Sequence, residues 1–369
     1  MKFNKVRLIE CLFGKVLMFL LKPIIFLKRK KSIINKINKK RVKNILIIRT
    51  GGIGDTLLAH PFFSKLKINF PNAQLTIIGI IRNKQTLEML RNKKIINNYI
   101  CMDNFKRLFF NFKTVFLNKY DLLFDLEQEY RIPALISFFA NSPIKIGFDT
   151  NERRWCYSSF INYNQDRYET LNFFEQLKVL DINLNLFEKE MILKTDKIIL
   201  NLPKNFVTIS LSADNIQNKL KNETVVDFCK EISKKYNLIF IGGKEDFKKA
   251  KIIIETLKIK RKCLNLCGKT SINGSIDILK KSKLFVGYDG GPLHMATCAG
   301  CKTISFFGSA LENKWNFPSK NHIKINLNYP CSPCMRGRFS RIPKCPYNYK
   351  CIKDISSKRI MGEVKKILK

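Results

Sequence analysis

Two runs of short apolar segments, each segment followed by a helical pattern, constrain the fold of this chain more than any other feature. The first run lies within residues 44–147 and the second within residues 206–307. The segments lack the strict polar–apolar alternation of a strand with one solvated face. They therefore predict parallel strands that are buried on both faces and connected by helices. We expect an α/β protein with two doubly wound, Rossmann-like domains.

Ten segments carry this prediction. The expected strands are Asn44–Arg49, Gln74–Gly79, Tyr99–Met102, Asp121–Asp125, Ile144–Gly147, Phe206–Leu211, Asn237–Gly243, Cys263–Gly268, Leu284–Gly287 and Thr303–Phe307. We expect residues 44–198 as the first domain, residues 199–354 as the second and residues 355–369 as a C-terminal helix, with the hinge near Lys194–Lys204. Ligands bind such sheets at the carboxyl ends of the strands, so two facing domains would form one cleft.

The N-terminal extension, residues 1–43, is basic and amphipathic. Residues 12–27 read LFGKVLMFLLKPIIFL, and the basic run KRKK follows at residues 28–31. The heaviest charge follows the apolar stretch and no cleavage site is visible, so a secretory signal does not fit. The stretch is shorter and more charged than a membrane-spanning helix. We expect a helix that lies in the membrane interface; a helix packed on the domain and a true anchor are the alternatives.

The net charge of +39 is extreme. Abundant Lys and Asn and scarce Ala indicate that part of it reflects compositional bias, and the remainder indicates anionic partners such as a membrane surface or an acidic glycolipid. No zinc-finger, RRM, KH or helix-turn-helix signature is present and the basic residues are spread along the chain, so we expect no nucleic-acid partner. Twelve cysteines are few for a disulfide scaffold of 369 residues and favour a reducing compartment.

A glycine-rich loop, RTGGIGDTLLAHP, lies between the first expected strand and its helix. It lacks the GK[ST] of a P-loop and the third glycine of the dinucleotide fingerprint. Gly51, Gly52 and Gly54 instead form a turn that presents Asp55 at the start of a helix, at the carboxyl edge of a sheet. Asp55 could bind a ligand there or only cap the helix, as Asp commonly does.

A second loop of this kind lies in the sequence FVGYDGGPLHMA, residues 285–296. Gly290 and Gly291 allow a close backbone approach, and the proline that follows suits the first turn of a helix. The free N–H groups of such a helix start commonly bind phosphate. Asp289 could contact a ligand or cap the helix, and His294 could bind a ligand or be a buried structural histidine.

Two further positions follow strands of the second run. Lys219 comes after the strand at residues 206–211 and could bind phosphate as a point charge, although any single lysine in so basic a chain is usually a surface residue. Glu245 lies in the first turn after the strand at residues 237–243. It could bind ribose hydroxyls or only complement the helix dipole.

Four cysteines cluster near the C-terminus with the spacing C-x2-C-x10-C-x5-C, at Cys331, Cys334, Cys345 and Cys351. Four thiolates can hold structural zinc, but this spacing is not that of a standard zinc ribbon. A disulfide pair and unmodified packing thiols are the alternatives.

Together these segments resemble the bacterial lipopolysaccharide heptosyltransferases of glycosyltransferase family 9. The resemblance rests on NILIIRTGGIGDTLLAHPFFSKLKINFPNAQLTIIG, NLIFIGGKED, LFVGYDGGPLHMATCAGCKTISFFG and the terminal CSPC segment, in that order. It spans residues 43–369 and implies a GT-B architecture. The first domain would bind a lipid-linked acceptor, and the second a nucleotide-activated heptose, normally ADP-heptose. The C-terminal helix, residues 355–368, would pack back on the first domain. Transfer in the family is inverting and needs no metal or other cofactor.

The resemblance also implies roles for the candidate residues. Asp55 matches the base of the family. Lys219 and the N–H groups of Gly290 and Gly291 would hold the diphosphate. Glu245 would hold the ribose, and Asp289 and His294 match the acid and histidine of the donor site. Two positions depart from the family pattern. Gly290 replaces a Ser or Thr, and no Trp-Pro follows Lys219.

The resemblance therefore implies a sugar transferase of the cell-envelope glycolipid pathway, acting at the cytoplasmic face of the inner membrane on a lipopolysaccharide or lipooligosaccharide core acceptor. A transferase of the same fold that uses another nucleotide sugar, or a capsule or glycoprotein acceptor, is the nearest alternative. A non-catalytic basic protein that binds lipid or nucleic acid is an alternative of another class.

Overall fold

The computed structural model describes residues 14–25, 37–102, 113–195, 200–213, 219–259, 262–335 and 345–369. The chain divides into two compact units, of which one ends at Leu186 and the other begins at Phe187. This division lies before the hinge expected at Lys194–Lys204. The reason is that the segment after Phe187 bonds to the second unit: Leu193 N donates to Cys298 O at 2.8 Å.

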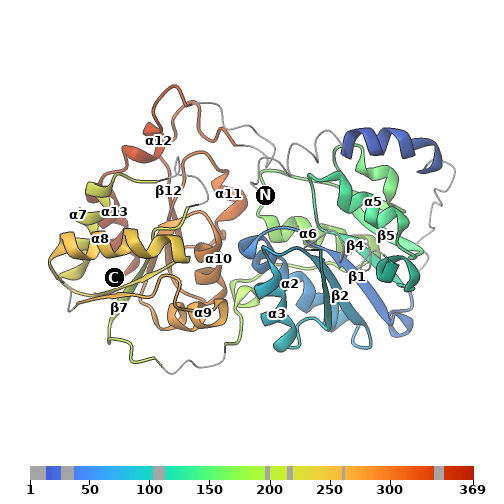
Figure 1. Ribbon diagram of the computed structural model, residues 1–369, viewed down its shortest axis with the longest axis horizontal. Coiled ribbons are helices and arrows are strands. Elements are labelled where there is room, and N and C mark those ends of the chain that lie inside the picture. Colours follow the sequence, from blue (N-terminus) through green and yellow to red (C-terminus); the bar gives the residue numbers. More distant parts are fainter. Residues whose placement is uncertain are drawn as a thin grey trace. The chain divides into compact units, whose positions relative to one another are not determined.

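The first unit is built on a six-stranded, fully parallel sheet with the order β3-β2-β1-β4-β5-β6 (Figure 1). Its strands are β1 (Asn44–Ile48), β2 (Gln74–Gly79), β3 (Asn98–Cys101), β4 (Leu122–Asp125), β5 (Ile144–Asp149) and β6 (Ser159–Asn162). Its helices are α2 (Ile53–Asn69), α3 (Lys84–Asn92), α5 (Arg131–Phe139) and α6 (Glu169–Leu177), with short 3₁₀ turns η1 (Lys39–Arg41), η2 (Arg153–Cys156) and η3 (Lys178–Leu180).

Helices cover both faces of this sheet. Leu123 of β4 packs in a cluster with Ile136 of α5, whereas the ring of the next residue, Phe124, meets Phe62 of α2 edge-on at 5.2 Å. Successive residues of a strand point to opposite faces, so α5 and α2 lie on opposite sides. The buried, apolar strands therefore result from a doubly wound arrangement, as predicted.

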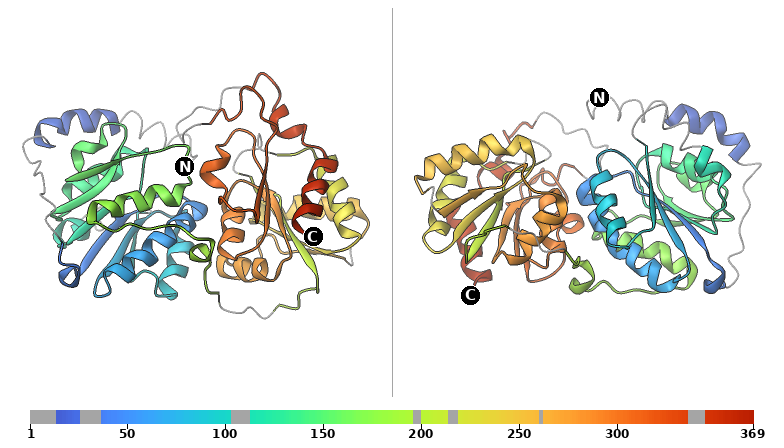
Figure 2. Two further views of the ribbon diagram at one scale, coloured as in Figure 1. Left: turned by 180° about the vertical axis from the view of Figure 1, so that it is seen from behind. Right: turned by 60° about the horizontal axis from the view of Figure 1, so that its bottom comes forward.

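The second unit repeats this plan with the order β12-β11-β10-β7-β8-β9. Its strands are β7 (Phe206–Ser210), β8 (Asn237–Ile241), β9 (Cys263–Asn265), β10 (Phe285–Tyr288), β11 (Thr303–Phe306) and β12 (His322–Ile325). Its helices are α7 (Asn222–Ser233), α8 (Phe247–Leu257), α9 (Ile272–Lys281), α10 (Gly291–Cys298), α11 (Glu312–Trp315), α12 (Lys350–Lys353) and α13 (Ser357–Ile367), with 3₁₀ turns η4 (Glu188–Met191) and η6 (Lys244–Asp246). Figure 2 shows α9 and α10 on one side of this sheet and α7, α8 and α13 on the other.

The C-terminal helix is packed within the second unit. Helix α13 belongs to that unit and contacts α7; packing on the first domain stays a prediction. Its apolar residues Ile360, Val364 and Ile367 recur at helical spacing and are buried in the core of the second unit. Lys302 also donates to Ile367 O at 2.9 Å. The apolar face of α13 is therefore buried within the second unit.

All ten expected strands are present, with shifts of at most three residues at their ends. Strands β6 and β12 were not predicted. Each lies at an edge of its sheet and is partly exposed. Their sequences therefore lack the continuous apolar run by which the central strands were recognised.

Residues 14–25 of the N-terminal stretch form a helix, and the rest of that stretch lies outside the described residues. Met18 and Ile25 of this helix are buried against Ala134 and Leu135 of α5 and against Tyr157. The structure therefore packs the helix on the first unit, one of the alternatives left open by the sequence. Within the described part of the chain, no helix is long and apolar enough to cross a membrane.

Candidate active site

Both sheets reverse their strand order at one point, between β1 and β4 in the first unit and between β7 and β10 in the second. In open α/β sheets, ligands bind beyond the carboxyl ends of the strands at such a switch point. The loop after β1 carries Asp55, and the loop after β10 carries Asp289. The two loops singled out in the sequence therefore lie at the two places that this fold offers to ligands.

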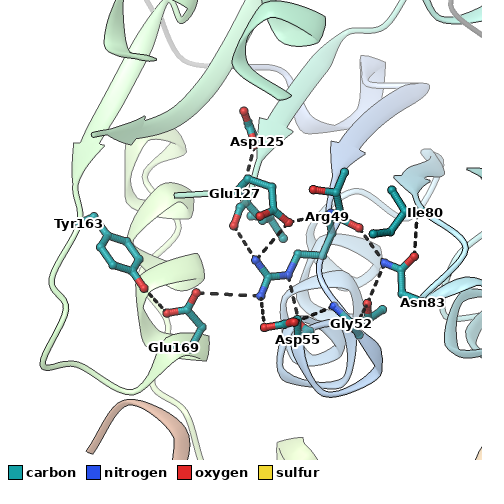
Figure 3. Close-up of polar contacts among 12 residues, drawn as sticks. Arg49, Gly52, Asp55, Ile80, Asn83, Asp125, Glu127, Tyr163 and Glu169 are labelled. Atoms are coloured by element: carbon teal, nitrogen blue, oxygen red, sulfur yellow. Dashed lines mark hydrogen bonds and ion pairs between the residues drawn. The ribbon is translucent and has the colours of Figure 1, made fainter. Parts of the chain in front are cut away.

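The loop after β1 holds Asp55 at the third position of α2 (Figure 3). Asp55 Oδ2 accepts a hydrogen bond of 2.6 Å from Gly52 N. Gly51 is needed here because a Cβ at this position would lie 2.4 Å from Asp55 Cβ. Gly54 lies in the first turn of the same helix. Asp55 thus caps the start of α2 from its third position, with Gly52 as the N-cap residue, and this bond uses only one of the two carboxylate oxygens.

The second carboxylate oxygen of Asp55 faces a buried arginine that the sequence analysis did not single out. Arg49, directly after β1, is fully buried. Its Nη2 lies 3.5 Å from Asp55 Oδ1, and its Nε donates to Asp55 O at 3.2 Å. The side chain of Asp55 itself remains 15% exposed. A fixed guanidinium therefore lies behind a carboxylate that still reaches solvent.

Arg49 is in turn held from three sides (Figure 3). Its Nη1 donates to Leu126 O at 2.9 Å and lies 3.5 Å from Glu127 Oε1. Its Nη2 lies 4.0 Å from Glu169 Oε1. Its guanidinium carbon lies 4.8 Å from the centre of the Phe173 ring. Charged groups this deeply buried are stable only when they are paired and hydrogen-bonded, and this arginine meets that condition.

Glu127 is positioned by the loop after β4, the other strand of the switch point. Its Oε1 accepts a hydrogen bond of 2.7 Å from Thr50 N, which links the two loops. Its backbone N donates to Asp125 Oδ1 at 2.9 Å. Asp125 is itself buried and bonded to Arg153 at 2.6 Å and to Tyr157 at 2.7 Å. The buried Asp125–Arg153 pair therefore positions Glu127, which in turn pairs with Arg49.

The pKa values in this region reflect its burial. Burial, followed by the neighbouring Glu169 carboxylate, raises the pKa of Tyr163 well above its usual value, and Tyr163 donates a hydrogen bond to Glu169. Burial also raises the pKa of Asp125, although the Arg153 guanidinium acts in the opposite direction. Tyr163 therefore remains a neutral hydrogen-bond donor over the physiological pH range.

The start of α2 is also tied to the neighbouring strand. Asn83, after β2, donates to Arg49 O at 2.8 Å and to Thr56 Oγ1 at 3.0 Å. Its own Oδ1 accepts from Ile80 N at 2.9 Å. Asn83 is completely buried. The Asp55 loop is therefore fixed by residues that follow β2 and β4 as well as by its own turn.

In the second unit, the turn after β8 contains two adjacent acidic residues that differ in their exposure to solvent. Asp246 is buried, and its Oδ2 accepts hydrogen bonds from Gly243 N at 3.2 Å and from Ser212 Oγ. Glu245 is exposed and lies over Gly243, where a Cβ would come within 2.1 Å of Glu245 Oε1. Asp246 therefore fixes the turn and leaves Glu245 accessible to a ligand.

Lys219 lies beside this turn. Burial and the neighbouring ammonium of Lys249 lower the pKa of Lys219 to about 8, while Asp246 and Glu245 act in the opposite direction. The next residue, Leu220, donates its backbone N–H to Tyr288 Oη at 3.3 Å, which ties the segment to β10. Two lysines thus lie close together near the carboxyl ends of the central strands, where an anion would relieve their mutual repulsion.

The start of α10 is formed by Gly290, which has a φ of +151°. Only glycine readily adopts such a backbone conformation. A Cβ at Gly290 would have nothing within 4 Å, so the requirement is conformational and not steric. Leu293 N and His294 N both bond to Gly290 O. The N–H groups of Gly290 and Gly291 can therefore serve a ligand, as helix starts commonly do.

Asp289 and His294 flank this turn. Asp289 is half-buried at the end of β10. His294 is buried, with its ring centre 6.4 Å from that of Trp315 in an edge-on arrangement. Trp315 was not considered in the sequence analysis. The donor candidates Lys219, Glu245, Asp289, Gly290, Gly291 and His294 thus all lie on segments that follow β7, β8 or β10, whereas Gly51, Gly52, Gly54 and Asp55 follow β1.

The four C-terminal cysteines belong neither to the candidate residues after β1 nor to those after β7, β8 and β10. Cys331, Cys334, Cys345 and Cys351 are free thiols. Among the described residues, no group of three His, Cys, Asp or Glu side chains is arranged to hold a metal ion.

Comparison with known proteins identifies the family. Glycosyltransferase family 9 (heptosyltransferase) matches residues 111–341, more than half of the chain. Lipooligosaccharide heptosyltransferase 2 of Campylobacter jejuni subsp. jejuni serotype O:6 is 26% identical over 322 residues, which cover 85% of this chain and 96% of the relative. Lipooligosaccharide heptosyltransferase 2 of Haemophilus ducreyi is 24% identical over 291 residues, which cover 68% of this chain and 79% of the relative.

Solved structures agree on the fold. ADP-heptose lipopolysaccharide heptosyltransferase II of Escherichia coli superimposes with a TM-score of 0.69 at 16% identity, covering 88% of this chain and 98% of that chain. The glycosyl transferase family 9 protein of Veillonella parvula gives a TM-score of 0.71 at 16% identity, and the match covers 90% of this chain and 99% of that chain. The predicted GT-B type fold, with two Rossmann-like units, is confirmed. The chain belongs to glycosyltransferase family 9, the heptosyltransferases.

Proposed function

We propose that this protein transfers heptose from ADP-heptose to a lipopolysaccharide or lipooligosaccharide core acceptor, with inversion at the anomeric carbon. The observation that carries the proposal is the position of Asp55. In a member of the heptosyltransferase family, a partly exposed carboxylate lies at the switch point of the first sheet, on a buried arginine. The named relatives that act in lipooligosaccharide synthesis support the choice of acceptor.

In the proposed reaction, Asp55 acts as the general base. The acceptor hydroxyl attacks the anomeric carbon while its proton passes to the Asp55 carboxylate. The new glycosidic bond forms as the bond from the anomeric carbon to the diphosphate breaks, and ADP leaves with the electron pair. The guanidinium of Arg49 lies 3.5 Å from the Asp55 carboxylate. It fixes the carboxylate in one orientation, which is a large part of what a base must provide.

In the second unit, the departing diphosphate gains negative charge that fixed donors must stabilise. The N–H groups of Gly290 and Gly291 and the ammonium of Lys219 are assigned to this task. Glu245, which is exposed beside its turn, would accept hydrogen bonds from the ribose hydroxyls. Asp289 and His294 would contact the donor from the start of α10. No metal or other cofactor is assigned a role in the proposed reaction.

The proposed acceptor is an anionic glycolipid, so we place the enzyme on the cytoplasmic face of the inner membrane as a peripheral protein. The net charge of +39 supports this placement, because an anionic surface concentrates a basic protein beside its substrate.

The proposal is tested by incubating the protein with ADP-heptose and a truncated core acceptor and following the acceptor by mass spectrometry. We expect addition of one heptose with release of ADP. A thermal-shift screen with ADP-heptose, UDP sugars and GDP sugars identifies the donor, and ADP-heptose should stabilise the protein most. If only a UDP or GDP sugar stabilised the protein, the proposed donor would be wrong. If transfer occurred only to a capsule or glycoprotein acceptor, the proposed acceptor would be wrong.

A further inference from the structure

The helix at residues 14–25 presents apolar side chains on two faces. On the inner face, Met18 and Ile25 are buried against α5 and the η2 turn, with Leu17 and Leu21 partly buried beside them. Figure 2 shows this helix, in dark blue, beside α5 in both views. The inner face therefore fixes the helix on the first unit, and the outer face is held in a defined orientation.

The outer face is exposed although it is apolar. Four large side chains on it are solvent-exposed, with exposed fractions of 57% for Val16, 75% for Phe19, 64% for Leu20 and 42% for Ile24. Their spacing of three, one and four residues places them on one side of a helix. Single exposed apolar residues are ordinary, but a row of four on one helix indicates a surface that contacts something apolar.

An apolar recess adjoins this row. It has a volume of about 400 Å³ and lies between the helix and the η2 turn. Phe19, Ile25 and Trp155 contribute apolar side chains to its lining. Trp155 is suited to a boundary between apolar and aqueous surroundings because its ring is amphipathic. The recess extends the apolar surface from the helix onto the body of the unit.

The charges around this surface are predominantly positive. Lys15 and Lys22 are exposed on the same helix and line the recess. Arg154 stacks on Trp155 at 4.7 Å. The acidic residue of the recess, Glu152, is bonded to Arg131 at 3.1 Å. In the sequence the basic run KRKK follows at residues 28–31. An occupant of this surface would therefore be apolar in part and anionic in part.

We propose that Val16, Phe19, Leu20 and Ile24, with Lys15 and Lys22, form a docking surface for an anionic lipid bilayer, named here the lipid-facing stripe. The helix would lie flat, with this stripe among the acyl chains and its lysines beside the headgroups. Because its inner face is packed on α5, membrane contact would orient the first unit, and with it Asp55, relative to the bilayer. The inference deepens the proposed function by naming the surface that meets the membrane.

The experiment uses the full-length protein without donor or acceptor, so it is independent of the transfer reaction. Cosedimentation is measured with phosphatidylcholine vesicles and with vesicles that contain phosphatidylglycerol. The test variant is Phe19→Gln/Leu20→Gln. The matched control is Ile68→Gln/Ile252→Gln, which removes two equally exposed apolar side chains from α2 and α8. Neither variant alters a buried residue, so both should unfold at the same temperature as the wild type.

We expect wild type and control to bind the anionic vesicles, and the Phe19→Gln/Leu20→Gln variant to bind at least about tenfold more weakly, because two apolar side chains lose their lipid contact. Lys15→Gln/Lys22→Gln should lower the binding to phosphatidylglycerol vesicles by several-fold and reduce its salt dependence. Equal binding by the stripe variant and the wild type would overturn the proposal. So would a stripe variant that changes only the oligomeric state in light scattering, since the occupant would then be a second copy of the chain.

Discussion

The two switch points of this protein are built in different ways. In the first unit, the Asp55 loop rests on buried charges, with Arg49 between three carboxylates and Asp125 and Arg153 behind them. In the second unit, the corresponding loop depends on backbone conformation, above all on Gly290 at a φ of +151°. Of its charged candidates, Glu245 is exposed and Lys219 is half-buried.

The difference follows the tasks that we assign to the two sites. A general base must be held in one orientation, because small displacements from the reactive geometry reduce the rate strongly. The groups of the second site are assigned to direct contacts with the diphosphate and the ribose, so changing them should first change donor affinity. The buried network is therefore expected to govern both stability and rate, and the open site chiefly to govern donor affinity.

Replacing Arg49 should have the largest effect on stability. Arg49→Met leaves the carboxylates of Asp55, Glu127 and Glu169 without their shared partner. Removing one member of a buried ionic cluster typically costs about 3–5 kcal/mol of unfolding free energy. The measurement is urea unfolding of the full-length protein with Trp315 replaced by Phe in every variant, so that Trp155 is the remaining tryptophan and its fluorescence reports the first unit.

The control for this prediction is Arg154→Met. Arg154 also pairs with an aspartate, Asp149, at 3.4 Å, but its side chain is 44% exposed. Exposed pairs of this kind contribute about 0–1 kcal/mol. Equal unfolding free energies for the two variants would show that the buried network does not stabilise the first unit.

Gly290→Ala tests the backbone basis of the second site. Alanine at a φ of +151° costs roughly 1–3 kcal/mol, or the turn changes its conformation, and in both cases the N–H groups at the start of α10 lose their arrangement. We expect weaker ADP binding by isothermal titration calorimetry, with a small loss of thermal stability.

Gly362→Ala is the matched control for this substitution. A Cβ at Gly362 also has nothing within 4 Å, but this glycine lies inside α13, where alanine stabilises a helix by about 0.5–1 kcal/mol. Both variants add a methyl group to open space and differ in backbone conformation. An unchanged ADP affinity in Gly290→Ala would remove this turn from the donor site.

Donor binding should depend on pH through Lys219. Its pKa, lowered to about 8 by burial and by Lys249, means that it is charged below pH 8 and loses its charge above it. If only the charged form binds diphosphate, the Kd for ADP should rise about fivefold between pH 8 and pH 9. Lys219→Arg, which stays charged, should remove this dependence. The same rise in the arginine variant would assign the titration to another group.

The sheets were predictable because their central strands are buried on both faces and read as continuous apolar runs. The edge strands β6 and β12 were not, because Ser159, Asn162 and Lys324 leave no apolar run longer than two residues in them. The packing of α13 was also not predictable from its sequence. An apolar stripe such as Ile360, Val364 and Ile367 shows that a helix is packed, but not against which surface.

The loops of the site were predictable from glycine, proline and acidic residues at strand ends. The buried residues that hold these loops in place could not be predicted in the same way. Arg49 meets Glu127, which lies 78 residues further along the chain, and nothing in either local sequence indicates that contact. Similarly, Glu245 and Asp246 are equivalent in sequence, and only the fold decides that Asp246 is buried and Glu245 exposed. The local sequence shows only that a charged residue, Arg49, follows an apolar strand, and its burial, which makes partners necessary, is known from the fold.

The most direct test of the account is Asp55→Asn. Asparagine can still accept the hydrogen bond from Gly52 N, so the capping role is kept while the base is lost. We predict that the turnover of heptose transfer falls about 10²–10⁴-fold, while the Kd for ADP stays close to that of the wild type. The unfolding temperature should fall less than in Arg49→Met, because Glu127 and Glu169 still pair with Arg49. Transfer at the wild-type rate by Asp55→Asn would contradict the account, because Asp55 would then be only the cap of its helix.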